Sequence, residues 1–363
     1  MTLYYIYILM SFLLSALSGL ILIPQIQKFC FKRGILDQPN SRKVHNIAVP
    51  RLGGMAFIPC MGFAFVASLS LLYYEQAQTH ISISMWSAMF IVSLTMIYIV
   101  GVVDDLLDLG PKIKFLVQIL AASMLPTSGL YINNLYGFLG IEDIPFWIGA
   151  LLTVFVIVFI DNAMNLIDGI DGLSGGLALI SLTGFLLCFG REGLWSYCVL
   201  IAGLMGVVCS YLYFNIWGKA DKGNKIFMGD SGSLSLGFIL GFLFVKFAMN
   251  SSKIMPYRND GLLLSYTLLI VPCFDVVRVV TERLRAHQPL FKADKRHIHH
   301  KLIQCGLSQH CVLVIILALQ ILLVAINMLL SDIINITYIV IVDIAVYTIF
   351  HITVDIIIKQ KKN

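Results

Sequence analysis

The sequence predicts an all-α bundle of about eleven helices that crosses a membrane repeatedly. Hydrophobic residues make up 59% of the 363 residues, while charged residues make up only 12%, roughly half the charged fraction of a soluble domain. The mean hydropathy is +0.88, and long apolar runs alternate with short polar stretches. A helix of about 20 apolar residues can cross a bilayer. We therefore expect one integral membrane domain over residues 1–363 rather than two soluble domains.

Eleven apolar stretches are candidate spans, with boundaries that we expect to shift by a few residues. The first is too long for a secretory signal peptide and lacks its basic start and small-residue cleavage site, so we interpret it as a retained helix. The predicted spans are residues 4–26, 53–74, 84–103, 115–131, 146–164, 175–190, 195–216, 232–250, 261–281, 311–330 and 334–358.

The chain has eight cysteines but no pair with CxxC spacing, and most of them lie inside apolar runs. Cysteine behaves as a small hydrophobic residue in such places. We predict core cysteines rather than a disulfide or zinc framework.

The basic residues between the spans are distributed unevenly over the two sides of the bundle. If the eleven helices alternate in direction, one side carries 20 of the 25 lysines and arginines, and the other carries Arg191, Lys253 and Arg258. Lys246 and Arg278 fall inside spans. Because basic loops stay in the cytoplasm, we predict a cytoplasmic C-terminus and an N-terminus outside.

Four polar clusters then lie on the predicted cytoplasmic side, where charges close to lipid are costly and usually functional. The central cluster, residues 161–176, contains Asp161, Asn165, Asp168 and Asp171 at intervals of three and four. If the preceding helix continued, these intervals would place oxygen ligands on one face, and such ligands suit Mg²⁺. A polar loop that caps the next helix is the alternative.

A second cluster, Asp104, Asp105 and Asp108, ends the third predicted span. Three adjacent carboxylates repel one another unless a cation, or Lys112 and Lys114, neutralises them. A metal or general-base site is the functional interpretation, and a solvated acidic helix end is the alternative.

The third cluster precedes the eighth predicted span and contains Gly229, Asp230, Ser231 and Ser233. Either serine could cap the helix, whose free N–H groups would attract an anion. Asp230 is then a helix cap or a metal ligand. Phe227 could cover a flat base or lie in the membrane interface.

The fourth cluster, His297, His299 and His300, lies with Arg296 in the most basic loop. No HExxH sequence or cysteine accompanies it, which disfavours zinc. Histidine and arginine at this density favour a phosphate site, with a loop that contacts lipid headgroups as the alternative.

The basic first loop, residues 42–54, could bind phosphate or the anionic lipid surface. Asp275 and Arg278, three apart in the ninth span, are expected to form a structural pair. The residues alone thus predict a membrane protein with a cytoplasmic magnesium and phosphate site, without identifying the phosphate compound.

Taken in order, the four motifs resemble those of the polyprenyl-phosphate N-acetylhexosamine-1-phosphate transferase superfamily, glycosyltransferase family 4. The resemblance extends from Pro50 to His300. The His-x-His-His motif and the Pro-Arg-Leu-Gly-Gly sequence at 50–54 are similar to the undecaprenyl-phosphate GlcNAc-1-phosphate transferase branch. The muramoyl-pentapeptide branch typically has three consecutive histidines.

The resemblance implies an eleven-helix enzyme of the bacterial inner membrane, with its site facing the cytoplasm. Such an enzyme transfers a sugar-1-phosphate, by default GlcNAc-1-phosphate, from a UDP-N-acetylhexosamine to undecaprenyl phosphate. It releases UMP and starts a cell-surface polysaccharide. We expect contacts with membrane lipids and no nucleic-acid partner, and a homodimer is left open.

The resemblance also implies residue roles. Asn165 and Asp230 match magnesium ligands, with Mn²⁺ as an alternative ion. The matching catalytic set is Asp104, Asp105, Lys114, Asp168, His297, His299 and His300, and the matching substrate-binding set is Asp171, Phe227 and Arg296. Residues 47–50 lack a further proline that the family often carries, so we leave the first loop out of both sets.

A cation-coupled transporter or flippase is the main rival, because it would also need carboxylates near the membrane. Transporter sites usually lie at the midplane between inverted repeats, whereas these carboxylates lie at helix ends and the sequence shows no repeat. The transferase is therefore the favoured interpretation.

Overall fold

The computed structural model describes residues 2–38, 47–75, 84–251, 255–289 and 296–362. The predicted all-α class is confirmed, with strands limited to two short antiparallel pairs among these residues. Arg42, Lys43, His45, Lys253, Lys292 and Lys295, which entered the charge count or the loop interpretations, lie outside the described residues.

The elements follow the predicted spans closely. The long helices are α1 (Thr2–Arg33), α2 (Phe57–Glu75), α3 (Met85–Leu107), α4 (Pro111–Thr127), α5 (Phe146–Ile167), α6 (Leu173–Arg191), α7 (Trp195–Ile216), α8 (Asp230–Ala248), α10 (Ile270–Arg285), α12 (Gln309–Leu330) and α13 (Ile336–Lys362). The short helices are η1 (Gly53–Ala56), η2 (Ala220–Lys222), α9 (Gly261–Thr267) and α11 (Ile298–Gln304), and the strand pairs are β1 (Leu36–Asp37) with β2 (Val49–Pro50) and β3 (Asn134–Phe138) with β4 (Ile141–Asp143).

Within the described residues, nine helices are long and apolar enough to cross a membrane, and the bent pair α9 and α10 supplies a tenth candidate. The predicted span at 115–131 corresponds to α4, which has 17 residues and is shorter than the nine. Every predicted span is therefore helical, while the number that cross the bilayer stays a prediction. The eight cysteines are free; five of them are buried, whereas Cys209 and Cys273 are half-buried and Cys311 is exposed.

The predicted span at 261–281 is not one continuous helix: the helix breaks and bends by 70° between α9 and α10, and the pair stays one candidate span. Pro272 explains the break: it has no N–H, and its ring would clash with the carbonyl four residues earlier, that of Leu268. The Leu268 carbonyl instead accepts a hydrogen bond from the Ser181 hydroxyl of α6 at 2.6 Å.

Gln320 of α12 satisfies the other backbone groups at the break. Its Nε2 donates to the Thr267 carbonyl at 2.9 Å, and its Oε1 accepts the Val271 N–H at 3.1 Å. Backbone groups at membrane depth need such partners because lipid offers none. The direction of α10 is thus set by a neighbouring helix.

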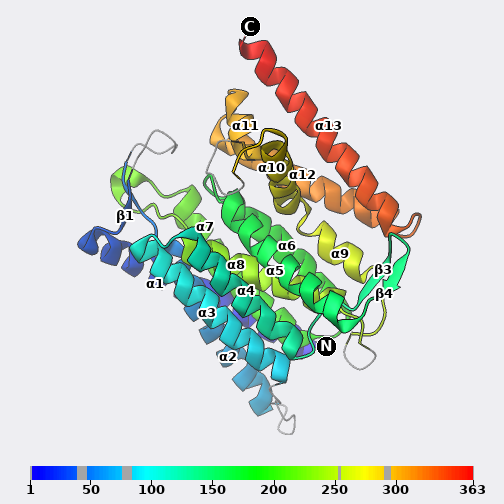
Figure 1. Ribbon diagram of the computed structural model, residues 1–363. Coiled ribbons are helices and arrows are strands. Elements are labelled where there is room, and N and C mark those ends of the chain that lie inside the picture. Colours follow the sequence, from blue (N-terminus) through cyan, green and yellow to red (C-terminus); the bar gives the residue numbers. More distant parts are fainter. Residues whose placement is uncertain (1, 39–46, 76–83, 252–254, 290–295, 363) are drawn as a thin grey trace.

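Helix α8 lies in the middle of the bundle, with α1 to α3 on one side and α12 and α13 on the other (Figure 1). Every residue of α8 from Ser231 to Ala248 is buried. Glycines allow α5 to approach: a Cβ added to Gly237 would lie 2.6 Å from the Cα of Asp161. The start of α8 is therefore held in a fixed place at one end of the bundle.

The two ends of the chain lie at opposite ends of the bundle (Figure 1). An odd number of spans predicts this arrangement. The assignment of the C-terminal end to the cytoplasm stays a prediction from the basic residues.

Candidate active site

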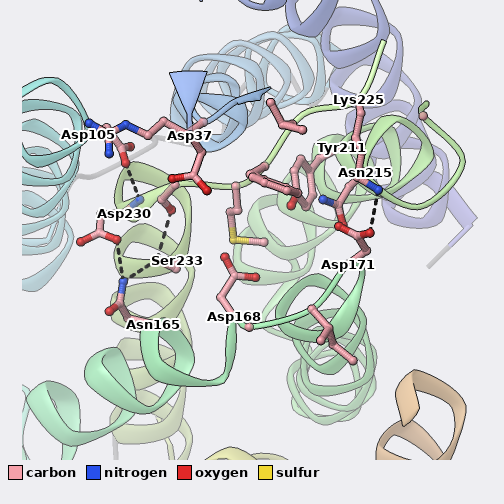
Figure 2. A pocket seen from close by; sticks show the side chains of 18 of the residues that line it. Asp37, Asp105, Asn165, Asp168, Asp171, Tyr211, Asn215, Lys225, Asp230 and Ser233 are labelled. Carbon is pink, nitrogen blue, oxygen red and sulfur yellow. Dashed lines mark hydrogen bonds and ion pairs between the residues drawn. The ribbon is translucent and has the colours of Figure 1, made fainter. Parts of the chain in front are cut away.

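A cavity of about 770 Å³ opens where α3, α5 and α8 meet the loops that follow α1, α5 and α7. Figure 2 shows Asn165, Asp168 and Asp171 in a row across it. The cavity wall includes nine of the twelve predicted site residues: Asp104, Asp105, Lys114, Asn165, Asp168, Asp171, Phe227, Asp230 and His300. Four motifs that are far apart in the sequence are therefore brought together.

Asp105 of α3 anchors the start of α8. Its Oδ1 accepts the backbone N–H of Asp230 at 2.8 Å, and its Oδ2 accepts that of Ser231 at 2.9 Å. A helix start carries unpaired N–H groups and partial positive charge, which this carboxylate satisfies. The expected serine caps are wrong, because the Ser233 hydroxyl donates to the Gly229 carbonyl instead.

Lys114 of α4 lies between two carboxylates. Its Nζ is 3.1 Å from Oδ2 of Asp104 and 2.6 Å from Oδ2 of Asp230. The ammonium offsets the repulsion that the two carboxylates would otherwise exert on each other. Lys114, one of the two lysines expected to neutralise the Asp104–Asp108 cluster, thus pairs with Asp104, whereas Asp108 pairs with Arg51. The Oδ1 atom of Asp104 is buried and has no hydrogen-bond partner within the described residues.

Asn165 joins α5 to α8. Its Nδ2 donates to Oδ1 of Asp230 at 3.1 Å and to the Ser233 hydroxyl at 2.8 Å. Asp161, expected on the same face one turn earlier, is instead fully buried against the backbone of Gly237 and does not line the cavity. The predicted row of oxygen ligands therefore excludes Asp161.

Helix α5 ends at Ile167 and does not continue through the polar cluster. Gly172 has a φ of +78°, a left-handed conformation that suits glycine. Its N–H donates to Oδ1 of Asn215 on α7 at 2.7 Å. Asp168 and Asp171 thus occupy a loop whose shape depends on a residue some forty positions away.

Asp171 pairs with Lys225, whose Nζ is 2.6 Å from Oδ2 of the aspartate. Asp168 lies between this pair and Asn165 (Figure 2). Burial of its carboxyl, with the negative charge of Asp230 adding to the effect, raises the pKa of Asp168 to about 7. The negative charge of Asp168 is therefore lost as the pH falls through neutrality.

The first loop forms part of the same site. The Phe227 N–H donates to the Pro50 carbonyl at 2.8 Å, the Gly53 N–H donates to the Phe227 carbonyl at 2.9 Å, and the Gly54 N–H donates to the Met228 carbonyl at 2.7 Å. Residues 50–54 are thus held along the segment that precedes α8.

This arrangement places Asp37, Val49 and Arg51 in the cavity wall, although the first loop was left out of the predicted site. NH1 of Arg51 is 3.0 Å from Oδ1 of Asp108. The glycine pair that follows Arg51 was the available signal, since glycines permit close backbone approach. Lys225 was also missed, because the sequence shows it only as one basic residue in a loop.

The three histidines are placed differently. His300 lines the cavity, whereas His297 and His299 are buried and do not. His299 packs against Gly169, where an added Cβ would lie 2.1 Å from Nε2 of the histidine. Burial lowers the pKa of His299 to about 3, so its imidazole is neutral at physiological pH. Arg296 also lies outside the cavity wall and donates to Oε1 of Gln288 at 2.6 Å.

Known proteins match the chain over most of its length. The profile of glycosyl transferase family 4 matches residues 86–248. The Bacillus subtilis (strain 168) protein named probable undecaprenyl-phosphate N-acetylglucosaminyl 1-phosphate transferase is 33% identical over 321 residues, which are 85% of this chain and 81% of the relative. The chain belongs to glycosyl transferase family 4.

Further relatives of this family 4 transferase place it in the same branch. Several proteins named undecaprenyl-phosphate alpha-N-acetylglucosaminyl 1-phosphate transferase also match it. The Yersinia pestis protein is 28% identical over 295 residues, which are 80% of this chain and 75% of the relative. The Escherichia coli (strain K12) protein is 27% identical over 307 residues, which are 84% and 78% of the two chains.

The polar groups of the transferase suit a hard cation that is only partly held by protein. Asp104, Asn165 and Asp230 present carboxylate and amide groups at the cavity, and Oδ1 of Asp104 is buried without a hydrogen-bond partner among the residues that the structure describes. In the described part of the chain, no three His, Cys, Asp or Glu side chains gather closely enough to hold a metal by themselves. Mg²⁺ usually keeps waters and shares substrate phosphates, so this donor set fits it.

Proposed function

We propose that the transferase moves GlcNAc-1-phosphate from UDP-GlcNAc to undecaprenyl phosphate, with release of UMP. The names of its relatives support the acceptor and the sugar. The structural observation that carries the proposal is the Asp104–Lys114–Asp230 cluster, which concentrates charge beside a cavity large enough for a nucleotide sugar. The product would be the lipid diphosphate sugar that starts a surface polysaccharide.

The reaction is a direct displacement at phosphorus. An oxygen of the lipid phosphate bonds to the sugar-bound phosphorus, the bond from that phosphorus to the bridging oxygen breaks, and UMP leaves with this oxygen. Such transfer depends mainly on positioning and charge neutralisation. The second pKa of a phosphate monoester is about 6, so the acceptor is mostly deprotonated at pH 7.

The two adjacent aspartates then have different tasks. Asp104 orients the acceptor phosphate or takes its remaining proton, because its Oδ1 has no hydrogen bond within the described protein. Asp105 has both oxygens engaged by backbone N–H groups. It places Asp230 rather than touching the acceptor.

Lys114 is placed to act on the donor diphosphate beside the residues that would hold the metal. Asn165 and Asp230 would hold Mg²⁺, or Mn²⁺ as an alternative, and the ion would neutralise phosphate charge. Lys114 supplies a further positive charge beside the same carboxylates. At the other side of the cavity, Asp171 and Phe227 receive the uracil, and His300 faces the diphosphate or sugar.

Membranes that contain the protein, Mg²⁺, UDP-GlcNAc and undecaprenyl phosphate should release UMP. Chelation with EDTA should abolish the release, and added Mg²⁺ should restore it. The measurement is UMP by chromatography, with membranes from cells that lack the gene as the control. Absence of UMP in the complete mixture would refute the proposal, and UMP release that survives EDTA would refute the metal.

Asn165→Ala and Asp171→Ala should affect different steps. Asn165 contacts Asp230, so its loss should raise the Mg²⁺ concentration needed for half-maximal rate by roughly ten- to a hundredfold. Asp171 lies with Lys225 across the cavity, so its loss should chiefly raise KM for the UDP-sugar. Titrations of rate against each ligand separate the two effects. If both variants changed only the Mg²⁺ concentration required, the separate roles of Asn165 and Asp171 would be contradicted.

The same assay with a panel of UDP-sugars identifies the donor. The proposed location is the bacterial inner membrane with the cavity toward the cytoplasm, which the charge distribution supports. The UDP-sugar is made in that compartment, so the donor would enter the cavity directly.

A further inference from the structure

Asp275 of α10 lies outside the cavity wall and grips the start of the histidine motif. Its side chain is fully buried. Its Oδ2 is 2.7 Å from Nδ1 of His297, and its Oδ1 accepts the backbone N–H of Ile298 at 3.0 Å. Arg278, one turn along α10, donates to Oδ1 of Asp275 at 2.8 Å and to the Arg296 carbonyl at 2.5 Å. Two side chains of one helix therefore hold three consecutive residues.

The negative charge of Asp275 is balanced by the positive charge of Arg278. A buried carboxylate is costly unless an opposite charge and hydrogen bonds accompany it, and Arg278 supplies that charge to Asp275. The second arm of Arg278 pairs with Glu282 at 2.7 Å, toward the partly exposed side of the helix. The carboxylate accepts a hydrogen bond from the Nδ1–H of His297, which favours the tautomer with its proton on Nδ1.

Residues 296–298, which Asp275 and Arg278 contact, form the start of α11. His297 directly precedes the helix, whose first residue is Ile298. His299 and His300 follow within the first turn, so they point where the start of the helix directs them. His299 packs against Gly169 of the cavity loop, and His300 lines the cavity.

Helix α10 is itself held in place by the Gln320 bridge at its break from α9. The contacts therefore run from α12, through the fixed direction of α10, to Asp275 and the start of α11. Each link is a hydrogen bond or ion pair between buried or half-buried groups, which suits a rigid support.

We infer that Asp275 is a positioning residue for the transfer reaction: with Arg278 it sets the start of α11 and so keeps His300 in the cavity wall. The inference rests on the proposed function. Asp275 touches no part of the cavity, so it acts through His300.

A double-mutant cycle between Asp275→Ala and His300→Ala tests this coupling. Asp275→Ala alone should lower kcat for UMP release by roughly ten- to a hundredfold, with KM for UDP-GlcNAc changed by less than about threefold. When two residues act as a unit, the effects of their substitutions on the rate are not additive. In the His300→Ala background, Asp275→Ala should therefore lower kcat by less than about twofold. Asp275→Asn should recover part of the rate, because its carbonyl oxygen can still accept the Ile298 N–H.

Rates are expressed per folded enzyme, with the folded fraction measured by gel filtration in detergent. Thr281→Ala is the control on the same helix, since the Thr281 hydroxyl donates an exposed hydrogen bond to the Val277 carbonyl of α10 itself, and it should change kcat by less than about twofold. The inference would be overturned if the decrease in kcat of the double variant equalled the product of the two single-variant decreases. An unchanged kcat per folded enzyme in Asp275→Ala would overturn it as well.

Backbone hydrogen exchange gives a readout that does not depend on the reaction. Asp275→Ala should speed exchange over residues 296–304 and leave α5 unchanged. An unchanged exchange rate over residues 296–304 would show that Asp275 does not hold the start of α11. If the wild type releases no UMP, the proposed function fails, while the exchange measurement still decides whether Asp275 holds α11.

Discussion

Asp230→Ala should reduce UMP release by roughly a thousandfold, the scale expected when a preorganised charge is removed from an active site. The Asp230 carboxylate is where Lys114 of α4 and Asn165 of α5 meet. Without it, the ammonium of Lys114 loses its closer carboxylate and keeps its pair with Asp104, and the proposed metal loses its charged ligand. The loss should appear in kcat rather than in KM for undecaprenyl phosphate.

Asp221→Ala is the matched control for Asp230→Ala. Asp221 lies on η2 in the same connection between α7 and α8, but it is exposed and outside the cavity wall. Its replacement should leave the rate within about twofold, as for most surface changes. Asp230→Asn, which keeps the shape of the side chain, shows whether the charge or the packing is required. A full rate in Asp230→Ala would remove this residue from the site.

Gly54→Ala should destabilise the whole protein, because two backbone segments touch at this position. An added Cβ would lie 2.0 Å from the Cα of Gly232 and 2.2 Å from its backbone nitrogen. Neither atom can rotate away as a side chain could, so η1 and the start of α8 would have to separate. Overpacking in a dense interior costs about 1–3 kcal/mol and occasionally more, and we expect the upper part of that range.

The measurement for Gly54→Ala is the thermal midpoint in detergent, followed by the yield of monodisperse protein. Gly62→Ala is the control, because Gly62 lies on the adjoining helix α2 and an added Cβ there meets nothing within 4 Å. Its midpoint should stay unchanged or rise slightly, since alanine favours helix more than glycine does. Equal midpoints for the two variants would show that the Gly54–Gly232 contact is not tight.

The helices could be predicted because a helix that crosses a bilayer needs a long apolar run, and each such run can be recognised from its local sequence alone. The break between α9 and α10 was missed for a physical reason. Pro272 alone only weakens one turn, whereas the bend needs Ser181 and Gln320 from other helices to satisfy the opened backbone. Those partners cannot be recognised from the local sequence.

In the site, too, features set by the local sequence could be predicted, whereas features set by distant residues could not. Residue types predicted which motifs would converge, and nine of the twelve predicted residues line one cavity. Roles that depend on distant partners were not predictable: Asp105 binds the start of α8, and Asp161 turns into the bundle although it is one turn from Asn165. Helical spacing tells which residues share a face, but the neighbours decide whether that face meets the cavity.

Helix α8 is completely buried and is also the least apolar of the nine candidate spans. A helix that meets only protein has no need to be soluble in lipid, so serines and glycines are acceptable along it. The same property affects biosynthesis. As α8 leaves the ribosome, lipid is a poorer environment for it than for α12. Four of the helices that pack against it, α2, α3, α5 and α6, have already been made, while α9 follows it. Insertion of α8 therefore depends on packing against helices that precede it in the chain, and α9 completes its surroundings afterwards.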